Sequence, residues 1–224
     1  ALVFSDNCHL SNLALQLPLE GQRENLIQRL RRFLDNCRVR SQVHYHPLVR
    51  QMFARWPDEE VNLVMDRTDI GQEKSILLLA VAFKHRAIPL SWRVLPFGGT
   101  GEALQIALLK EVQPYLPVGK RVMFYGDSEF RAVGLQGYCR QQDWGWQVGV
   151  KSDTLFPQGN ENWQPLHPIS IEPGQRRYLH ALTLTQSNAF GPVSLMIDWT
   201  YEGDTPRYVV CHRPTYGYTW RQGR

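Results

Sequence analysis

Two short apolar runs, each ending on an aspartate, stand out in the pattern of hydrophobic and polar positions. The first is VNLVMD, residues 61–66, and the second is RVMFYGD, residues 121–127. Runs of aliphatic, β-branched and aromatic residues of this length are typical of buried strands. Each run therefore predicts a strand that ends on a carboxylate, Asp66 or Asp127, and holds it in a fixed position at the edge of a sheet.

Further apolar runs place these two strands in an order of elements. We expect helices at 102–115 and 130–142 and further strands at 76–83, 86–95 and 144–150. Short links between the first three strands favour an antiparallel meander. The order is three strands, helix, strand, helix, strand, with an acid after the first and the fourth strand. This order resembles the ribonuclease H-like fold, so we predict an α/β protein with a mixed sheet of that type.

The two aspartates predict a metal site. Two carboxylates brought side by side repel each other and resist ionising together unless a cation lies between them. Mg²⁺ takes oxygen ligands and commonly binds one or two carboxylates together with substrate phosphates. Asp66 and Asp127 thus favour Mg²⁺ as the cofactor, with Mn²⁺ as a substitute, and a phosphodiester as the substrate.

The segments on either side of this core have different patterns. Residues 13–40 carry apolar positions at spacings of three and four, surrounded by arginines, which predicts a basic helical region. The basic face, with Arg29 and Arg32, either contacts DNA phosphates or is a solvated helix face. From residue 151 onward, prolines and glycines separate β-rich runs, which predicts a small all-β subdomain.

Two other motifs are interpreted as structural. His44 and His46 in VHYHP would point the same way from a strand, a spacing able to chelate a metal. No third ligand is recognisable nearby, so we expect a turn or short strand before Pro47 and a short helix over 47–56. The loop FGGTGE lacks the lysine and serine that end a phosphate-binding loop and is interpreted as a turn.

Composition narrows the class of protein. At 224 residues with 43% hydrophobic content, the chain suits one large domain or a domain with a subdomain. The longest apolar run, 75–83, is too short to span a membrane, and no export signal is recognisable, so we expect a cytoplasmic bacterial protein. Four dispersed cysteines argue against a zinc site and a disulfide framework. A net charge of +4 permits a polyanionic partner.

With these motifs the chain resembles the IS4-type DDE transposases, the superfamily that includes the Tn5 transposase. The resemblance is carried by VMDRTD with Asp66, YGDSEFR with Asp127, the basic N-terminal part and the β-rich segment. In that family a third acid, a glutamate, lies on a later helix in the pattern Tyr-x2-Arg-x3-Glu-x6-Lys. YTWR supplies Tyr218 and Arg221 at this spacing. The glutamate is then expected at position 225, one residue beyond Arg224.

The resemblance implies DNA-mediated transposition, in which DNA is cut at insertion-sequence ends and joined to a target by two-metal chemistry. Asp66 would contact both metal ions and Asp127 one, while Arg221 and Tyr218 would contact DNA. The expected partners are the transposon ends and the target DNA, with a homodimer on DNA and association with the nucleoid. The expected parts are a helical N-terminal region (1–58), a ribonuclease H-like core (59–150), an all-β insertion (151–214) and the start of the final catalytic helix (215–224).

One departure from the family concerns the second acid, where the family often has Asp-Arg-Gly-Phe and this chain has DSEF. The extra carboxylate, Glu129, is either a helix-start residue that complements the helix dipole or a surrogate metal ligand. Glu161, Glu172 and Glu202, all in the predicted insertion, are alternative third acids. Two other functions remain open: a catalytically incomplete remnant that only binds DNA, and another ribonuclease H-like nuclease.

Overall fold

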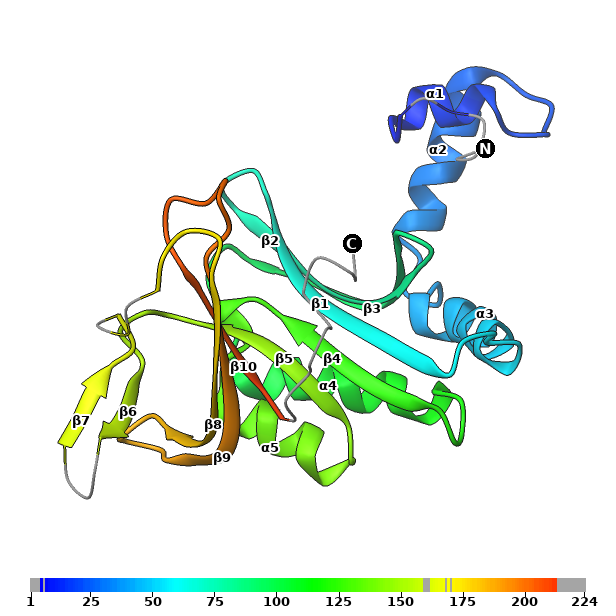
Figure 1. The fold of residues 1–224 in the computed structure, drawn as a ribbon. Helices are drawn as coiled ribbons and strands as arrows, with labels where there is room; N and C mark the ends of the chain where they lie inside the picture. The colour runs from blue at the N-terminus through cyan, green and yellow to red at the C-terminus, as the bar shows by residue number, and fades with distance from the viewer. Residues whose placement is uncertain (1–4, 6, 159–161, 168, 170, 213–224) are drawn as a thin grey trace. The chain divides into compact units, whose positions relative to one another are not determined.

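A computed structural model describes residues 5, 7–158, 162–167, 169 and 171–212 of the chain (Figure 1). The chain divides into two compact units, Ala1–Gln51 and Met52–Arg224, which we describe separately. The boundaries predicted at residues 58, 150 and 214 stay predictions.

The second unit is built on a sheet whose central strands have ribonuclease H-like topology. The eight strands lie in the order β3-β2-β1-β4-β5-β10-β9-β8. Neighbours β1, β2 and β3 are antiparallel, whereas β4 and β5 run parallel to β1 and to each other. The predicted fold class is therefore confirmed. The bounds of these five strands are β1 (Glu60–Ile70), β2 (Lys74–Phe83), β3 (Arg86–Pro96), β4 (Arg121–Gly126) and β5 (Gly145–Val150).

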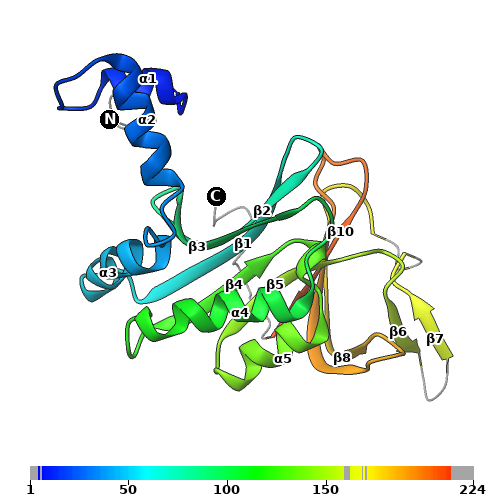
Figure 2. The same ribbon diagram turned by 180° about the vertical axis from the view of Figure 1, so that it is seen from behind.

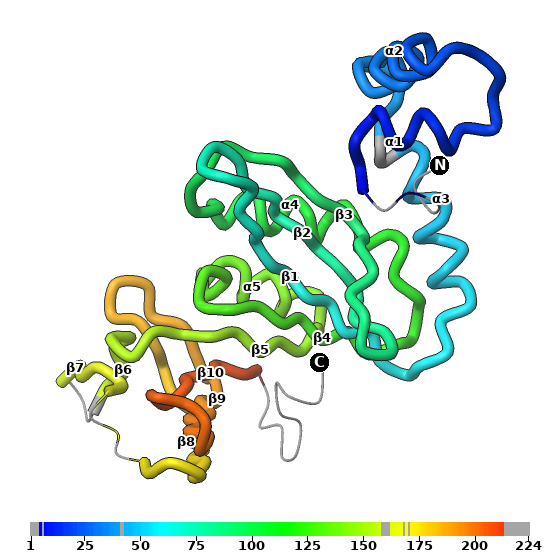
Figure 3. Tube along the Cα trace, turned by 90° about the horizontal axis from the view of Figure 1, so that it is seen from above, coloured from blue at the N-terminus to red at the C-terminus, as the bar shows by residue number. Residues whose placement is uncertain are grey.

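The strands that follow β5 extend the same sheet. Strands β10, β9 and β8 continue it in antiparallel fashion beyond β5, and seen from above β10 follows β1, β4 and β5 (Figure 3). A separate two-stranded sheet is formed by β6 and β7, which the sequence pattern did not predict. The bounds are β6 (Leu155–Gln158), β7 (Asn162–Pro165), β8 (Arg176–Leu184), β9 (Phe190–Asp198) and β10 (Arg207–Cys211).

Two helices, α4 (Glu102–Val112) and α5 (Val133–Gln141), cover one face of the sheet (Figure 2). Short 3₁₀ turns, η2 (Gln113–Tyr115) and η3 (Ser128–Phe130), adjoin them. On β1 the side chains of Val61, Leu63 and Met65 are buried, while the residues between them are more exposed. This alternation is the period-2 pattern of a strand with one face in the core, and it sets the face on which each later residue of β1 lies.

The N-terminal region differs from its prediction. The helical pattern of 13–40 is two helices, α1 (Leu10–Leu15) and α2 (Arg23–Leu34). The turn or strand predicted before Pro47 was wrong, because α3 (Ser41–Ala54) runs through Pro47. His46, Val49 and Phe53 recur on one side of α3 and are buried, so burial of this helical face outweighs the local preference of proline.

Among the described residues, no helix has both the length and the apolar character needed to cross a lipid bilayer.

Candidate metal and nucleic-acid site

The sheet register brings Asp66 and Asp127 to the same level of neighbouring strands. The parallel pairing of β1 with β4 runs from Glu60 and Arg121 to Val64 and Tyr125. Continuing each strand by two residues reaches Asp66 on one and Asp127 on the other. Neighbouring strands lie about 4.8 Å apart, and Asp66 and Asp127 lie two residues beyond the last pair of this ladder.

The strand does not end at Asp66, as the sequence pattern suggested. β1 continues to Ile70, and Asp66 is paired with Leu78 of β2. The pairing of β1 with β4 ends two residues earlier, at Val64 and Tyr125, and β4 itself ends at Gly126. Asp66 therefore stands on a continuous hairpin, beside the point where the neighbouring strand leaves the sheet.

Both carboxylates are exposed to solvent. Asp66 belongs to the more exposed face of β1, opposite the face that carries Leu63 and Met65. Asp127 caps the turn η3, and its Oδ1 accepts a hydrogen bond from the backbone N–H of Glu129 at 2.8 Å. The two acids are thus accessible to a cation from solvent, and one of them is held by a backbone donor.

Glu129 lies in the first turn of η3, as one of its two predicted roles requires, and its carboxylate is also part of an ion pair. Its Oε2 accepts a hydrogen bond from Nε of Arg67 at 2.8 Å, and Arg67 follows Asp66 on β1. Successive side chains of a strand point to opposite faces, so the Glu129 carboxylate meets β1 on the face opposite to Asp66. The Glu129 carboxylate is therefore held in an ion pair between η3 and β1, in addition to its place at the start of η3.

The loop before α4 completes this ion-pair network. Thr100 donates two hydrogen bonds to Oε1 of Glu129, one from its backbone N–H at 3.0 Å and one from Oγ1 at 2.8 Å. Thr100 is held in turn by the buried side chain of Gln105, which donates to its carbonyl oxygen and to Oγ1. The FGGTGE loop, predicted as a turn, thus presents Thr100 to the turn that follows Asp127.

Glu129 and Arg67, the two charged groups of this ion pair, stay ionised at neutral pH. Burial raises the pKa of the Glu129 carboxyl, but hydrogen bonds from Arg67 and Thr100 and the charge of Arg67 lower it further, so the net pKa lies below the ordinary value. The pKa of Arg67 is raised, first by its hydrogen bond to Glu129. Both groups therefore stay ionised and compensate each other.

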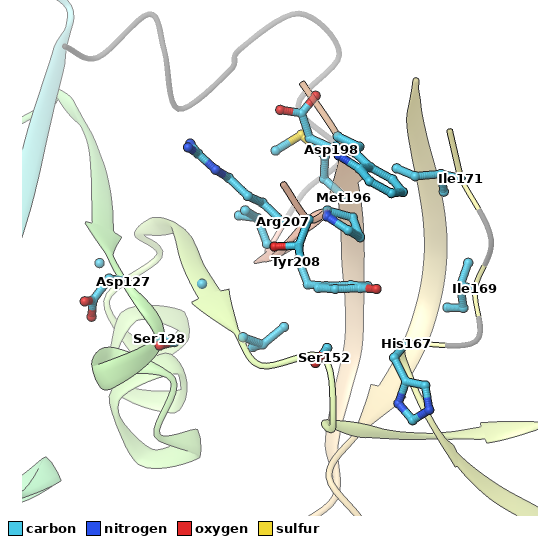
Figure 4. A pocket seen from close by; sticks show the side chains of 17 residues that line it. Asp127, Ser128, Ser152, His167, Ile169, Ile171, Met196, Asp198, Arg207 and Tyr208 are labelled. Carbon is cyan, nitrogen blue, oxygen red and sulfur yellow. The ribbon is translucent and has the colours of Figure 1, made fainter. Parts of the chain in front are cut away.

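A cavity of about 860 Å³ opens beside Asp127 (Figure 4). Asp127 and Ser128 lie at one side of it, and the Arg207 side chain extends from β10 toward that side. Arg207 is exposed and makes no hydrogen bond or ion pair with the part of the chain that the structure describes. Tyr208 is among the buried residues of the lining. The cavity therefore combines the Asp127 carboxylate, a guanidinium that pairs with no described residue, and an aromatic side chain.

Sequence reasoning missed Arg207 and Gly149. Arg207 opens an ordinary β-rich run, RYVVCH, and no local signal separates it from the other arginines. Gly149 follows the last residue of β5 that pairs with β4, and a side chain there would place its Cβ 3.2 Å from the carbonyl carbon of Asp127. A glycine inside a strand pattern is the signal of such a close backbone approach.

Among the described residues of the second unit, the other predicted acids do not join the two aspartates in a group of ligands. Arg29 and Arg32 are exposed on α2, in the other unit, and pair with no residue in the described ranges. Glu172 is bonded to Gln175, and Glu202 lies exposed in the turn after β9. His44 is exposed and His46 buried, so as helix residues they do not form a pair of ligands. Tyr218, Arg221 and Glu161 lie outside the described residues.

The donor set fits a hard divalent cation in part. Two exposed carboxylates from neighbouring strands are the oxygen ligands that Mg²⁺ and Mn²⁺ take. In the described residues, however, no group of three or more His, Cys, Asp or Glu side chains is placed to hold a metal ion. Asp66 and Asp127 would supply two of the ligands of such a site, and water or phosphate oxygens are suited to the others.

No protein-family model matches the sequence, and no curated protein sequence matches it. Two solved structures are similar in chain path at low sequence identity. A piggyBac transposase in a synaptic complex with hairpin DNA is 12% identical, with a TM-score of 0.47, over 98% of this chain and 50% of that one. The Argonaute of Marinitoga piezophila, in complex with 5′ OH guide RNA and target DNA, is 9% identical, with a TM-score of 0.35, over 96% of this chain and 33% of that one. The chain thus spans about half the length of the first protein and a third of the second.

Proposed function

We propose that this chain carries the catalytic core of a DNA transposase of the IS4-type DDE class, which cuts DNA at insertion-sequence ends and joins it to a target. The observation that carries the proposal is the matched position of Asp66 and Asp127, two exposed carboxylates that each lie two residues beyond the last pair of the parallel strands β1 and β4. In a sheet of ribonuclease H-like topology, such a pair is suited to hold divalent cations over a phosphodiester.

Asp66 and Asp127 are the residues that would hold the metal. When bound, Mg²⁺ or Mn²⁺ supplies a Lewis acid that activates an attacking oxygen and stabilises the leaving oxygen of a phosphodiester. The residues of this chain fix where that happens. The hairpin of β1 and β2 holds Asp66, and the capped turn η3 holds Asp127. A third acidic ligand, the glutamate that the resemblance implies at position 225, is part of the proposal.

The cavity beside Asp127 is the proposed entry for DNA. Arg207 is a guanidinium without a protein partner in the described chain, and guanidinium groups bind phosphate through paired hydrogen bonds. The exposed arginines of α2, including Arg29 and Arg32, add phosphate contacts that carry no sequence information. We therefore expect DNA affinity that falls steeply with salt.

The first test is binding of Mn²⁺ to the chain itself, measured by the loss of the free-ion signal in electron paramagnetic resonance. We expect wild type to bind Mn²⁺ and both Asp66→Asn and Asp127→Asn to lose that binding, because each removes one of two charged ligands. Asp58→Asn is the matched control, since Asp58 is an exposed aspartate that precedes β1. Binding that persists in both site variants rules out this pair as the metal site.

The second test is cleavage by the complete protein on DNA with and without terminal repeats. Asp66→Ala and Asp127→Ala should abolish Mg²⁺-dependent cleavage and retain DNA binding, because phosphate affinity comes from arginines elsewhere. Cleavage that requires the repeats supports a transposase. Cleavage without any repeat preference indicates another nuclease of this fold, and DNA binding without cleavage in wild type indicates a remnant.

A further inference from the structure

The two candidate metal ligands lie just beyond the backbone pairing that aligns their strands. The last paired residues of β1 and β4 are Val64 and Tyr125, two residues before Asp66 and Asp127. Like charges at neighbouring positions repel each other. Because no β1–β4 backbone pair lies at their level, the separation of the two carboxylates depends on other contacts.

A chain of side-chain contacts replaces the missing backbone pairing. The backbone N–H of Glu129 donates to Asp127 at 2.8 Å, and the carboxylate of the same residue accepts from Nε of Arg67 at 2.8 Å. Arg67 directly follows Asp66 on β1. Glu129 therefore links Asp127 to Arg67, the neighbour of Asp66. Arg67 and Glu129 are 62 positions apart in the sequence.

Both ends of this link are themselves anchored. Thr100 donates two hydrogen bonds to the second carboxylate oxygen of Glu129. Nη1 of Arg67 donates to Asp69 at 2.6 Å, and the hydroxyl of the fully buried Ser75 donates to the same Asp69 oxygen at 2.7 Å. The side chains of Arg67 and Glu129 are only 22% and 21% exposed. A partly buried pair held at both ends keeps one geometry, unlike an exposed surface pair.

We propose that the Arg67–Glu129 ion pair, anchored by Thr100, is a positioning device that sets the separation of the Asp66 and Asp127 carboxylates and thereby their affinity for a divalent cation. The inference rests on the proposed metal site of these two aspartates. Glu129 acts through them and not as a ligand, because one of its oxygens is bonded to Arg67 and the other to Thr100.

The test is a double-variant cycle on Mn²⁺ binding, with Glu129→Gln, Arg67→Ala and the two combined. Loss of a group that orients metal ligands typically costs 10–100-fold in metal affinity, so we expect each single variant to weaken Mn²⁺ binding by about tenfold or more. The double variant should bind Mn²⁺ with about the affinity of the single variant that binds it less tightly, because both substitutions remove the same link. Thr100→Val removes the hydroxyl bond to Glu129 and the bond that Gln105 donates to this hydroxyl, but it keeps the backbone bond to Glu129, so it should weaken binding less.

Glu111→Gln is the matched control. It breaks the ion pair of Glu111 with Arg93, whose side chains are 18% and 33% exposed, at a place between β3 and α4. We expect this variant to bind Mn²⁺ like wild type. Circular dichroism and metal-free thermal unfolding check that each variant is folded, and Arg67→Lys with Thr100→Val gives a milder pair if Arg67→Ala does not fold.

The outcomes separate this inference from the proposed function. If Asp66→Asn abolishes Mn²⁺ binding but the Arg67 and Glu129 variants bind like wild type, the positioning role is wrong and the metal site stands. If Arg67→Ala strengthens Mn²⁺ binding while Glu129→Gln weakens it, Glu129 is a ligand and the inference is also overturned. If wild type binds no Mn²⁺, both proposals fail.

Discussion

Phe130 is the buried side chain that holds the turn after Asp127 against the sheet, and its truncation tests how the second acid is supported. It ends η3, its side chain is fully buried, and its backbone N–H donates to the carbonyl of Asp127 at 3.2 Å. A Cβ added at Gly126 would lie only 2.8 Å from the Phe130 Cβ, so the chain closes tightly here. Phe130→Ala removes the ring and leaves a cavity beneath the acid.

The size of the effect follows from burial. Truncation of a fully buried phenylalanine to alanine costs about 3–5 kcal/mol, which combines the lost transfer free energy with that of the cavity. Phe97, in the same unit, is 58% exposed. Full burial of such a side chain contributes about 1.5–3 kcal/mol, so Phe97→Ala should cost about 1 kcal/mol. The two variants make the same chemical change and differ in burial.

Urea unfolding followed by tryptophan fluorescence measures the free energy of unfolding of wild type, Phe130→Ala and Phe97→Ala. For a unit of this size each kcal/mol lowers the melting temperature by about 2–4 °C. In thermal unfolding, Phe130→Ala should therefore melt at least about 6 °C lower than wild type. Phe130→Ala should also weaken Mn²⁺ binding, because Asp127 caps the turn that it supports. Equal losses of stability in the two variants would refute the reasoning.

Two further predictions concern the support of the acids. Burial raises the pKa of Glu129, but its hydrogen bonds and its ion pair with Arg67 lower it further, to below 4.5 in the folded state. The ionised Glu129 carboxylate therefore contributes fully to stability above pH 4.5, and this contribution is lost as pH falls through the folded-state pKa. Urea unfolding at a series of pH values should give free energies of unfolding for wild type and Glu129→Gln that converge at low pH. A difference between the two free energies that does not change with pH contradicts this. Gly149→Ala pushes a Cβ to within 3.2 Å of the Asp127 carbonyl carbon, so Mn²⁺ binding should weaken, whereas Gly137→Ala, with open space around it, should bind like wild type.

Local sequence pattern was sufficient for the elements of the core. The alternation in VNLVMD places Val61, Leu63 and Met65 on the buried face, and period 2 leaves Asp66 on the other face. The apolar run RVMFYGD predicted β4, and short links predicted the antiparallel hairpins β1–β2–β3. Such features depend on neighbours within a few residues, which is why a single sequence encodes them.

The pattern failed where distant packing outweighs local preference. Pro47 favours a break in the chain, yet α3 runs through it because His46, Val49 and Phe53 are buried along one side. The hairpin of β6 and β7 also escaped prediction, since proline and glycine interrupt its sequence and the segment joins no other strand ladder in the described residues.

The sequence by itself determined the two candidate acids, Asp66 and Asp127, because each follows an apolar run that can be recognised without the structure. Only the tertiary structure decided that Asp66 and Asp127 stand at one level, that Glu129 turns away from them to Arg67, and that Arg207 extends toward the acid's side of the cavity. Strand register and contacts between residues far apart in sequence come from packing of the whole sheet, and side-chain period alone does not specify them.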